Sequence, residues 1–440
     1  MLYFLLPLVL FVAIYFLFLY YRSQKYQYNV AADYIYQLDK NLLLQTKMQS
    51  NTLQLPENYK NYDSLFLKIS LSFNPFSCFF KPYIKIENFK HYFEYGAKGV
   101  RYINISHVKH DLLKINLKNL TLLNGEVSIY AYQNNINLAD KILILAPHAD
   151  DAEIAAFGLY KKAEDVTIVI TTAGEYGSCN YCEIYNHNKT KQSLKKAELR
   201  IFDALCVPLL GNVTMQNCFT LGYFDLSLKW MYEHKTETAS SLIQGINDMN
   251  IFRKVSHAKV KLSHDTQPTY YSFVDDIKNI VIQTKPDIIL TPHPTIDSHS
   301  DHKHTTLALI HALKETNHKC KLLLYTNHLK LSRTYPIGEI HSSITLPPNK
   351  QDFYFDSIYS SELNHDLQID KFFALESMHD LRDSLVFISI KQSFNHLTRM
   401  IKRKFTGKDK SYYKRAIRAN ELFFVVDSEN MDKLLDPEDH

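Results

Sequence analysis

The chain has 440 residues, of which 46% are hydrophobic and 22% are charged. This balance allows a buried core and excludes a wholly disordered or fibrous protein. Eleven glycines are too few for a collagen-like or glycine-linker architecture, and six cysteines are too few for a disulfide scaffold. A formal net charge of +4 does not by itself indicate a nucleic-acid-binding protein.

The chain begins with an apolar segment. Residues 2–21 carry no charged side chain, and about 20 apolar residues can cross a ~30 Å hydrocarbon layer as a helix. Bulky aromatic residues near its end are unlike a signal-peptide cleavage site. We therefore expect an uncleaved transmembrane anchor over residues 1–25. Arg22 and Lys25 follow the apolar stretch, so the positive-inside rule predicts a single-pass membrane protein with the rest of the chain in the cytoplasm.

Two further segments precede the largest predicted domain. Residues 26–50 mix polar and apolar side chains in a way that suggests a helical stalk. Residues 51–137 are rich in aromatic residues and alternate apolar with polar side chains, which predicts a small β-rich accessory domain of antiparallel strands. It carries no catalytic spacing, and we expect a spacer or docking module, with carbohydrate binding as the alternative.

From residue 141 the chain follows a strand, loop, helix rhythm. An apolar strand at 141–146 precedes a polar loop, and a second apolar strand at 287–290 precedes another. The pattern predicts an α/β fold, a Rossmann-like three-layer arrangement around a mostly parallel sheet, over residues 138–427. An acidic tail covers 428–440, and residues 232–271 are an insertion without clear periodicity.

The two polar loops concentrate residues that bind metals. The first contains His148, Asp150 and Asp151, and the second has four histidines and two aspartates within 293–304. Open parallel sheets place ligands at the carboxyl ends of their strands. A catalytic zinc site uses three His or carboxylate ligands and leaves one position open. We expect the two loops to meet over the sheet and to hold a metal.

The motifs in these loops resemble those of one enzyme family. PHADDAEIAAFG is similar to the His-Pro-Asp-Asp-Glu signature of the PIG-L/LmbE-like N-acetylglucosaminyl deacetylases, and HSDH is similar to their later His-x-Asp-His signature. Weaker similarities are TTAGEYG, KKAELRIFDAL, LGYFD and YYKRAIRANELFFVV. The resemblance spans about residues 138–427.

The resemblance implies a role for each matching residue. It implies that the zinc ligands are His148, Asp151 and His302, with Fe²⁺ as the alternative metal, and that the general base is Asp150. It implies that the imidazole of His299 faces the reacting carbonyl and that Asp301 orients it. The implied sugar contacts are Glu175, Lys195 and Asp225. Ala149 and Ser300 replace family prolines, Ala152 is inserted before Glu153, and the family commonly has arginine at the position of Lys195.

The function that the resemblance implies is hydrolysis of an N-acetyl group on N-acetylglucosamine in a glycolipid or other glycoconjugate. The alternatives are a metal-dependent amidase for a non-sugar amide and a catalytically idle glycan-binding protein.

Two other features are open at the level of sequence. Cys179 and Cys182 form a CNYC motif, but no second pair has zinc-ribbon spacing, so we do not expect a metal there. Residues 399–418 contain nine basic residues and one acidic residue. This run predicts an anionic partner, for which we expect anionic lipid headgroups or a phosphate-bearing substrate in preference to nucleic acid.

Overall fold

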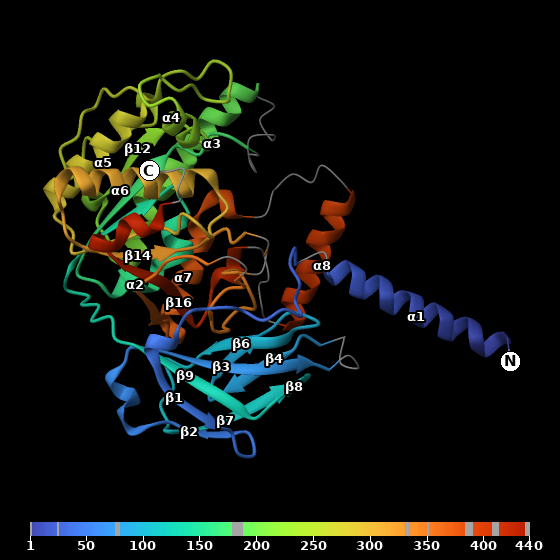
Figure 1. Ribbon diagram of the computed structural model, residues 1–440. Helices are drawn as coiled ribbons and strands as arrows, with labels where there is room; N and C mark the ends of the chain where they lie inside the picture. Colours follow the sequence, from blue (N-terminus) through green and yellow to red (C-terminus); the bar gives the residue numbers. More distant parts are fainter. Residues whose placement is uncertain are drawn as a thin grey trace. The chain divides into compact units, whose positions relative to one another are not determined.

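The protein is represented by a computed structural model that describes residues 2–23, 26–74, 80–177, 188–330, 332, 335–349, 352–382, 390–406 and 413–435. The chain divides into two compact units (Figure 1). One unit comprises Met1–Gln133 with His328–Asp352, and the other comprises Asn134–Asn327 with Phe353–His440. The chain therefore returns to its first unit after most of the second has been formed.

The N-terminal apolar segment forms helix α1 (Leu2–Ser23). None of the helices in the described part of the chain combines the length and the apolar character that crossing a membrane requires. The predicted transmembrane helix and single-pass membrane localisation are wrong, and the cytoplasmic orientation inferred from Arg22 and Lys25 loses its basis. The fold is mixed α/β with several sheets.

The first unit is built from two antiparallel sheets. One has the order β1-β9-β3-β6, with β8 also paired to β3, and the other has the order β2-β7-β4-β5. The strands are β1 (Leu42–Lys47), β2 (Thr52–Gln54), β3 (Ser64–Phe73), β4 (Tyr83–Ile86), β5 (Phe89–Tyr92), β6 (Lys98–Asn104), β7 (Leu112–Lys118), β8 (Leu120–Leu122) and β9 (Glu126–Tyr132). Strand β1 lies in the segment predicted as a helical stalk.

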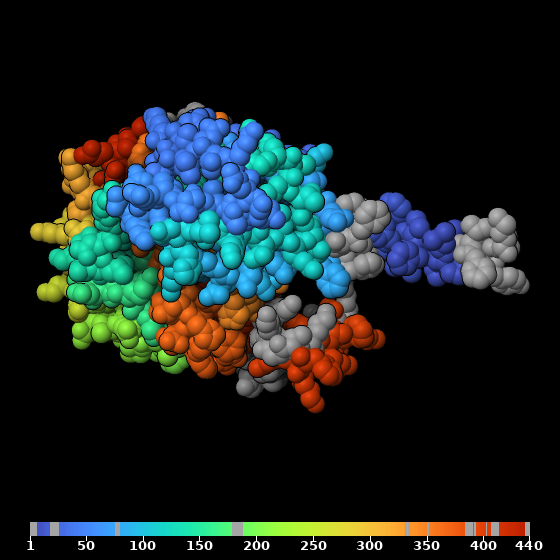
Figure 2. All heavy atoms as spheres, turned by 90° about the horizontal axis from the view of Figure 1, so that it is seen from below, coloured from blue at the N-terminus to red at the C-terminus, as the bar shows by residue number. Residues whose placement is uncertain are grey.

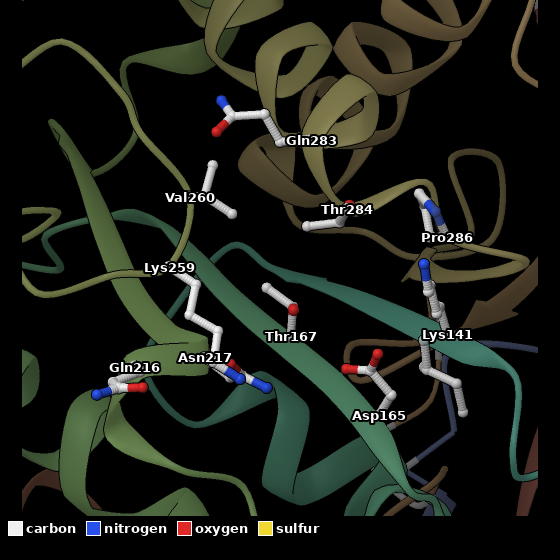
Figure 3. Close-up of a pocket in the computed structure, with 11 residues that line it drawn as sticks. Lys141, Asp165, Thr167, Gln216, Asn217, Lys259, Val260, Gln283, Thr284 and Pro286 are labelled. Atoms are coloured by element: carbon white, nitrogen blue, oxygen red, sulfur yellow. The ribbon is translucent and has the colours of Figure 1, made fainter.

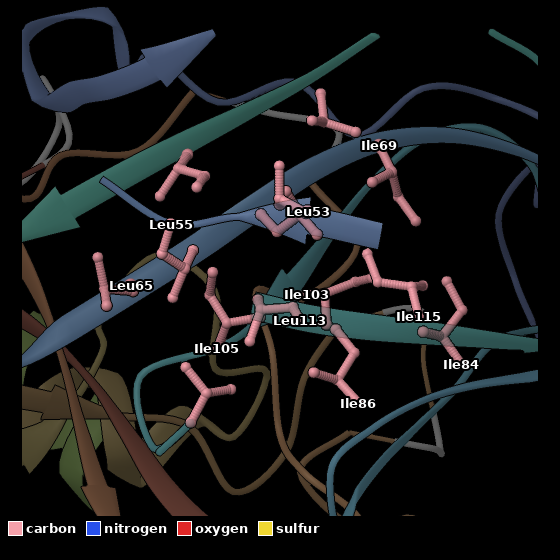
Figure 4. Packing of buried hydrophobic residues seen from close by; sticks show 14 of the residues in the cluster. Leu53, Leu55, Leu65, Ile69, Ile84, Ile86, Ile103, Ile105, Leu113 and Ile115 are labelled. Atoms are coloured by element: carbon pink, nitrogen blue, oxygen red, sulfur yellow. The ribbon is translucent and has the colours of Figure 1, made fainter. Parts of the chain in front are cut away.

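Strand alternation produces the core of this unit. In β7, Leu113 and Ile115 are buried while their neighbours in sequence are exposed, because successive side chains point to opposite faces of a sheet. They join Leu65 and Ile69 of β3 and Ile84 of β4 in one apolar cluster (Figure 4). In the space-filling view, the blue-to-cyan residues form a continuous face (Figure 2). The β-rich unit thus has a core of its own.

Residues 328–352 are tied to this unit by hydrogen bonds. The Asn104 side chain donates to the carbonyl of Ile344 (3.1 Å), and the Thr345 hydroxyl donates to the carbonyl of Tyr102 (2.8 Å). The Tyr36 hydroxyl donates to the Pro347 carbonyl at 2.7 Å.

The second unit surrounds a seven-stranded sheet of order β12-β11-β10-β13-β14-β16-β15. The strands from β12 to β14 are parallel, whereas β16 and β15 are antiparallel. The strands are β10 (Lys141–Ala146), β11 (Asp165–Thr172), β12 (Cys218–Tyr223), β13 (Ile288–Pro292), β14 (Lys321–Tyr325), β15 (Ser357–Glu362) and β16 (Asn420–Asp427). The helices are α2 (Asp151–Lys162), α3 (Lys189–Cys206), α4 (Leu228–Glu233), α5 (Tyr270–Thr284), α6 (Ser300–Thr316), α7 (His365–Ser377) and α8 (Ile390–Thr406).

Apolar spacing explains how the helices cover this sheet. In α5, Phe273, Ile277, Ile280 and Val281 recur at helical spacing and are all completely buried, and α5 packs along α6. Four neighbouring parallel strands (β12, β11, β10 and β13) end at the same edge of the sheet. The loops that follow these strands therefore approach one another.

Candidate metal and catalytic site

The loops after four parallel strands carry the predicted site residues. His148 follows β10, and the next helix begins at Asp151. His299 caps the N-terminus of α6, where Asp301 and His302 occupy the first turn. Glu175 follows β11 and Asp225 follows β12. Of these residues, only His299 is more than marginally accessible, and the others are buried.

Three of these side chains place ligand atoms at the corners of a small triangle. His148 Nδ1 lies 3.2 Å from Asp151 Oδ2, and His302 Nε2 lies 3.1 Å from the same oxygen. The two histidine nitrogens are 3.3 Å apart. Ligand atoms around a tetrahedral Zn²⁺ at about 2.0 to 2.2 Å lie roughly 3.3 to 3.6 Å from one another. The residues present therefore fit a metal of this size, although their geometry does not distinguish Zn²⁺ from Fe²⁺.

The remaining nitrogens of the two imidazoles face carboxylates. His148 Nε2 is 3.3 Å from Asp225 Oδ1 and 3.5 Å from Asp301 Oδ2, and His302 Nδ1 is 3.1 Å from Asp297 Oδ2. Metal-binding histidines commonly donate their second nitrogen to a carboxylate in this way, which orients the ring. Asp225, predicted as a sugar contact, thus lies against the metal-ligand cluster itself.

The electrostatics of the cluster favour positive charge. Burial lowers the pKa of His148, but hydrogen bonds to Asp151, Asp225 and Asp301 outweigh burial and raise it well above the ordinary value. His302 is also opposed by burial, yet Asp151 and Asp297 raise its pKa to about 10. Burial favours the neutral form of Asp151, but the two histidines hold its pKa well below the usual range. The buried carboxylates that stabilise these imidazolium ions would also stabilise a bound metal cation, which the two imidazoles would bind in their neutral form with release of their protons.

Asn327 is a further member of the site that the sequence did not indicate. Its side-chain nitrogen donates to Asp151 Oδ1 at 2.9 Å, and its backbone nitrogen donates to Asp297 Oδ2 at 2.9 Å. It follows β14, the next parallel strand, and it links a predicted metal ligand to the aspartate behind His302. No motif marks an asparagine at this distance along the chain.

His299 lies beside the triangle in a neutral form. Its ring centroid is 4.6 Å from that of His148. Burial, with the nearby His148 and His302, lowers its pKa to about 4. Its Nδ1 accepts a hydrogen bond from the backbone nitrogen of Asp301 at 3.3 Å, so Nε2 carries the proton of the neutral ring. The Asp301 carboxylate instead accepts from the backbone nitrogen of Leu226 at 2.7 Å.

Asp150 has a different partner from its neighbour. Its half-buried carboxylate pairs through Oδ1 with Arg200 Nη2 at 3.1 Å, and the same guanidinium also pairs with Asp380. Arg200 rests against Gly174, which has a φ of +64°, and a Cβ there would lie 2.4 Å from Arg200 Nε. A glycine at this position therefore lets the arginine approach Asp150.

The predicted sugar contact Lys195 lies on α3, the helix that also carries Arg200, but on a different face. Its side chain is exposed, and its Nζ pairs with Glu198 at 2.6 Å. Five residues of α-helix correspond to a rotation of about 140°, which separates the direction of Lys195 from that of Arg200. The structure thus brings a different basic residue of α3 to the site.

Glu175 is completely buried behind the loop that carries Asp225. Its carboxylate accepts from the Asp225 backbone nitrogen (3.1 Å) and from the Ser241 hydroxyl (2.7 Å). Burial raises its pKa to about 7. These contacts make it a support for the Asp225 loop.

The other two histidines of the second loop, His293 and His304, contact groups outside the triangle of proposed metal ligands. His293 is buried against the rings of Phe353 and Phe424, and burial lowers its pKa to about 3. His304 lies one helical turn beyond the site, with Nδ1 2.7 Å from the Ser300 carbonyl. Cys179 and Cys182 lie outside the described residues.

A pocket of about 380 Å³ lies at the opposite edge of the sheet (Figure 3). The starts of β10 and β11 line it through Lys141 and Asp165, together with Lys259 and Gln283. It contains none of the predicted site residues, and the proposed metal ligands lie at the carboxyl ends of the strands.

Comparison with known proteins identifies the domain that carries the cluster. Residues 143–313 match the family model PIG-L: GlcNAc-PI de-N-acetylase. No curated protein matches the chain.

Solved structures that match part of this chain include the N,N'-diacetylchitobiose deacetylase from Pyrococcus horikoshii, at 17% identity and a TM-score of 0.35, over 66% of this chain and 85% of that one. Another is the A40926 pseudoaglycone deacetylase, at 15% identity and a TM-score of 0.35, over 66% of this chain and 98% of that one. A third is a zinc-inhibited teicoplanin deacetylase, at 16% identity and a TM-score of 0.34, over 66% of this chain and 99% of that one. The family match has both signature loops within its limits, and residues 143–313 of this chain form a PIG-L family domain.

Proposed function

We propose that the chain is a metal-dependent deacetylase that hydrolyses the N-acetyl group of an N-acetylglucosamine unit in a glycoconjugate. The observation that carries the proposal is the triangle of His148 Nδ1, Asp151 Oδ2 and His302 Nε2, whose edges are 3.1 to 3.3 Å. The PIG-L family domain supports the reaction type. The choice of Zn²⁺ over Fe²⁺ and the choice of sugar belong to the proposal.

The proposed chemistry divides the work between the metal and the protein. A bound Zn²⁺ would act as a Lewis acid and would lower the pKa of a water molecule. Asp150 is the group that accepts the proton of the attacking water, because its carboxylate is half-buried and lies next in sequence to a proposed ligand. Arg200 holds that carboxylate in one orientation.

His299 is suited to the opposite side of the reacting carbonyl. Its pKa of about 4 keeps the ring neutral near pH 7, and the hydrogen bond accepted by Nδ1 leaves the proton on Nε2. A neutral Nε2–H can donate to the carbonyl oxygen as negative charge develops there. Asp301 fixes this arrangement through its backbone nitrogen.

The proposal is tested by measuring acetate release from a panel of N-acetyl sugars and simple acyl amides, with and without a chelator. We expect release from N-acetylglucosamine compounds and its loss when the metal is removed. Hydrolysis of simple amides alone would indicate a different amidase. Sugar binding without acetate release in the metal-loaded protein would indicate a glycan-binding protein and would contradict the proposal.

The ligand assignment has a separate test. We expect His148→Ala, Asp151→Ala and His302→Ala each to lower the metal content of the purified protein, as measured by elemental analysis. Lys195→Ala is the matched control, because its side chain is exposed and pairs with Glu198 one turn along the same helix. Full metal occupancy in all three ligand variants would refute the assignment.

A further inference from the structure

Among the described residues, helix α8 exposes more large apolar side chains than any other helix of its unit. The exposed fraction is 90% for Ile390 and 82% for Phe405, and four further large apolar residues of the helix are at least 47% exposed. By contrast, the apolar residues of α5 that recur at helical spacing are completely buried. An apolar face of this size on a protein surface marks an interaction site.

Five of these six exposed residues gather on one side of the helix, and Met400 lies outside that arc. At 100° per residue, Ile390, Phe394, Leu397, Ile401 and Phe405 fall within an arc of about 80°. These five are the apolar face of α8. The helix lies between residues 383–389 and 407–412, both outside the described residues (Figure 1).

The charge of the helix indicates what this face contacts. Residues 390–406 contain five basic residues and no acidic residue. Arg399 and Arg403 are exposed and lie opposite the apolar face in the helical projection, whereas Lys404 lies at its border. An apolar arc with basic residues around it is typical of a helix that lies in the plane of an anionic membrane surface.

A second copy of the chain is a poorer occupant for the same face. Two α8 helices packed face to face would bring two sets of five positive charges together without an acidic residue from either helix. We propose that α8 docks on an anionic lipid surface, with its apolar face in the headgroup boundary and its net positive charge adding attraction to the anionic lipids. The proposal concerns a helix outside the PIG-L family domain and is independent of the proposed reaction.

The test uses the full chain in co-sedimentation with vesicles of phosphatidylcholine, alone or mixed with phosphatidylserine. We expect stronger binding to the phosphatidylserine vesicles and weaker binding as salt is added. The combined variant Phe394→Ser, Leu397→Ser and Phe405→Ser should lose roughly tenfold or more in binding, because its apolar contact is removed. Arg399→Gln with Arg403→Gln should lower the preference for phosphatidylserine, by about fivefold for each arginine.

A matched control replaces exposed apolar residues elsewhere on the same unit. Leu242→Ser, Tyr271→Ser and Ile282→Ser alter side chains that are 50 to 60% exposed, and this variant should bind vesicles like the original protein. Equal binding by the α8 apolar variant and the original protein would overturn the proposal. So would self-association without vesicles that the α8 variant abolishes, since the occupant would then be a second copy.

Discussion

Replacement of Glu153 by glutamine should stabilise the protein near neutral pH. Glu153 is buried in the first turn of α2, where the Tyr160 hydroxyl donates to its Oε1 at 3.1 Å. Burial raises the pKa of this carboxyl from 4.5 to about 8. Near pH 7 the folded protein must therefore keep a proton that the unfolded chain has released. Glutamine retains an oxygen for Tyr160 and removes the ionisation.

The magnitude follows from the two pKa values. A raised carboxyl pKa contributes stability that is fully present below pH 4.5 and is lost as the pH rises toward about 8. Each pH unit in this window corresponds to about 1.4 kcal/mol. Between about pH 5 and pH 7, the free energy of unfolding of the original protein should fall by roughly 2 to 3 kcal/mol relative to Glu153→Gln.

The assay is urea unfolding of both proteins at several pH values, with a chelator present so that metal binding does not contribute. The difference between the two free energies cancels the titration of groups that both proteins share. A difference that stays constant from about pH 5 to pH 8 would refute the reasoning, because Glu153 would then have the same pKa in the folded and unfolded states.

Two further predictions separate neighbouring groups of the site. Asp150→Asn should keep the metal and lower turnover by about 10²- to 10⁴-fold, whereas Asp151→Asn should lose the metal first and recover part of its activity in excess zinc. Metal titration followed by measurement of acetate release compares the two variants. Rescue of Asp150→Asn by zinc would contradict the assignment of Asp150 as base and Asp151 as ligand. Gly174→Ala should displace Arg200 and lower kcat, as Arg200→Ala should, because both changes disturb the contact between Arg200 and Asp150. Lys195→Ala should change kcat little. Steady-state kinetics measure these effects, and a normal kcat in both Gly174→Ala and Arg200→Ala would exclude a positioning role for the arginine.

Local sequence order determined which parts of the site were predictable. His148 and Asp151 are three residues apart at a strand-to-helix junction, so their approach follows from backbone geometry and a short motif reports it. Arg200 reaches Asp150 from another helix, and its direction depends on how α3 packs. Lys195, which was matched to the family arginine, points away from Asp150. Residue spacing shows which residues share a face of a helix, but which face turns toward the site depends on how the helix packs.

The fold divides in the same way. The strand after residue 141 and the β-rich segment have patterns that local alternation explains. Pairing of β1 with β9 depends on contacts about 80 residues apart, which composition does not encode. The apolar run at the N-terminus shows the opposite case, since its hydropathy suggested a span that no described helix provides.

The return of the chain to the β-rich unit limits how the protein can be divided by genetic truncation. A fragment ending at Gln133 lacks His328–Asp352, which belongs to the same unit. The Asn104 and Tyr36 side chains would lose the carbonyls of Ile344 and Pro347 as acceptors. A fragment that begins at Asn134 would instead carry this segment without its partners. To separate the units, the fragment that begins at Asn134 would need a short linker in place of His328–Asp352. The fragment that ends at Gln133 would need the segment His328–Asp352 fused to it.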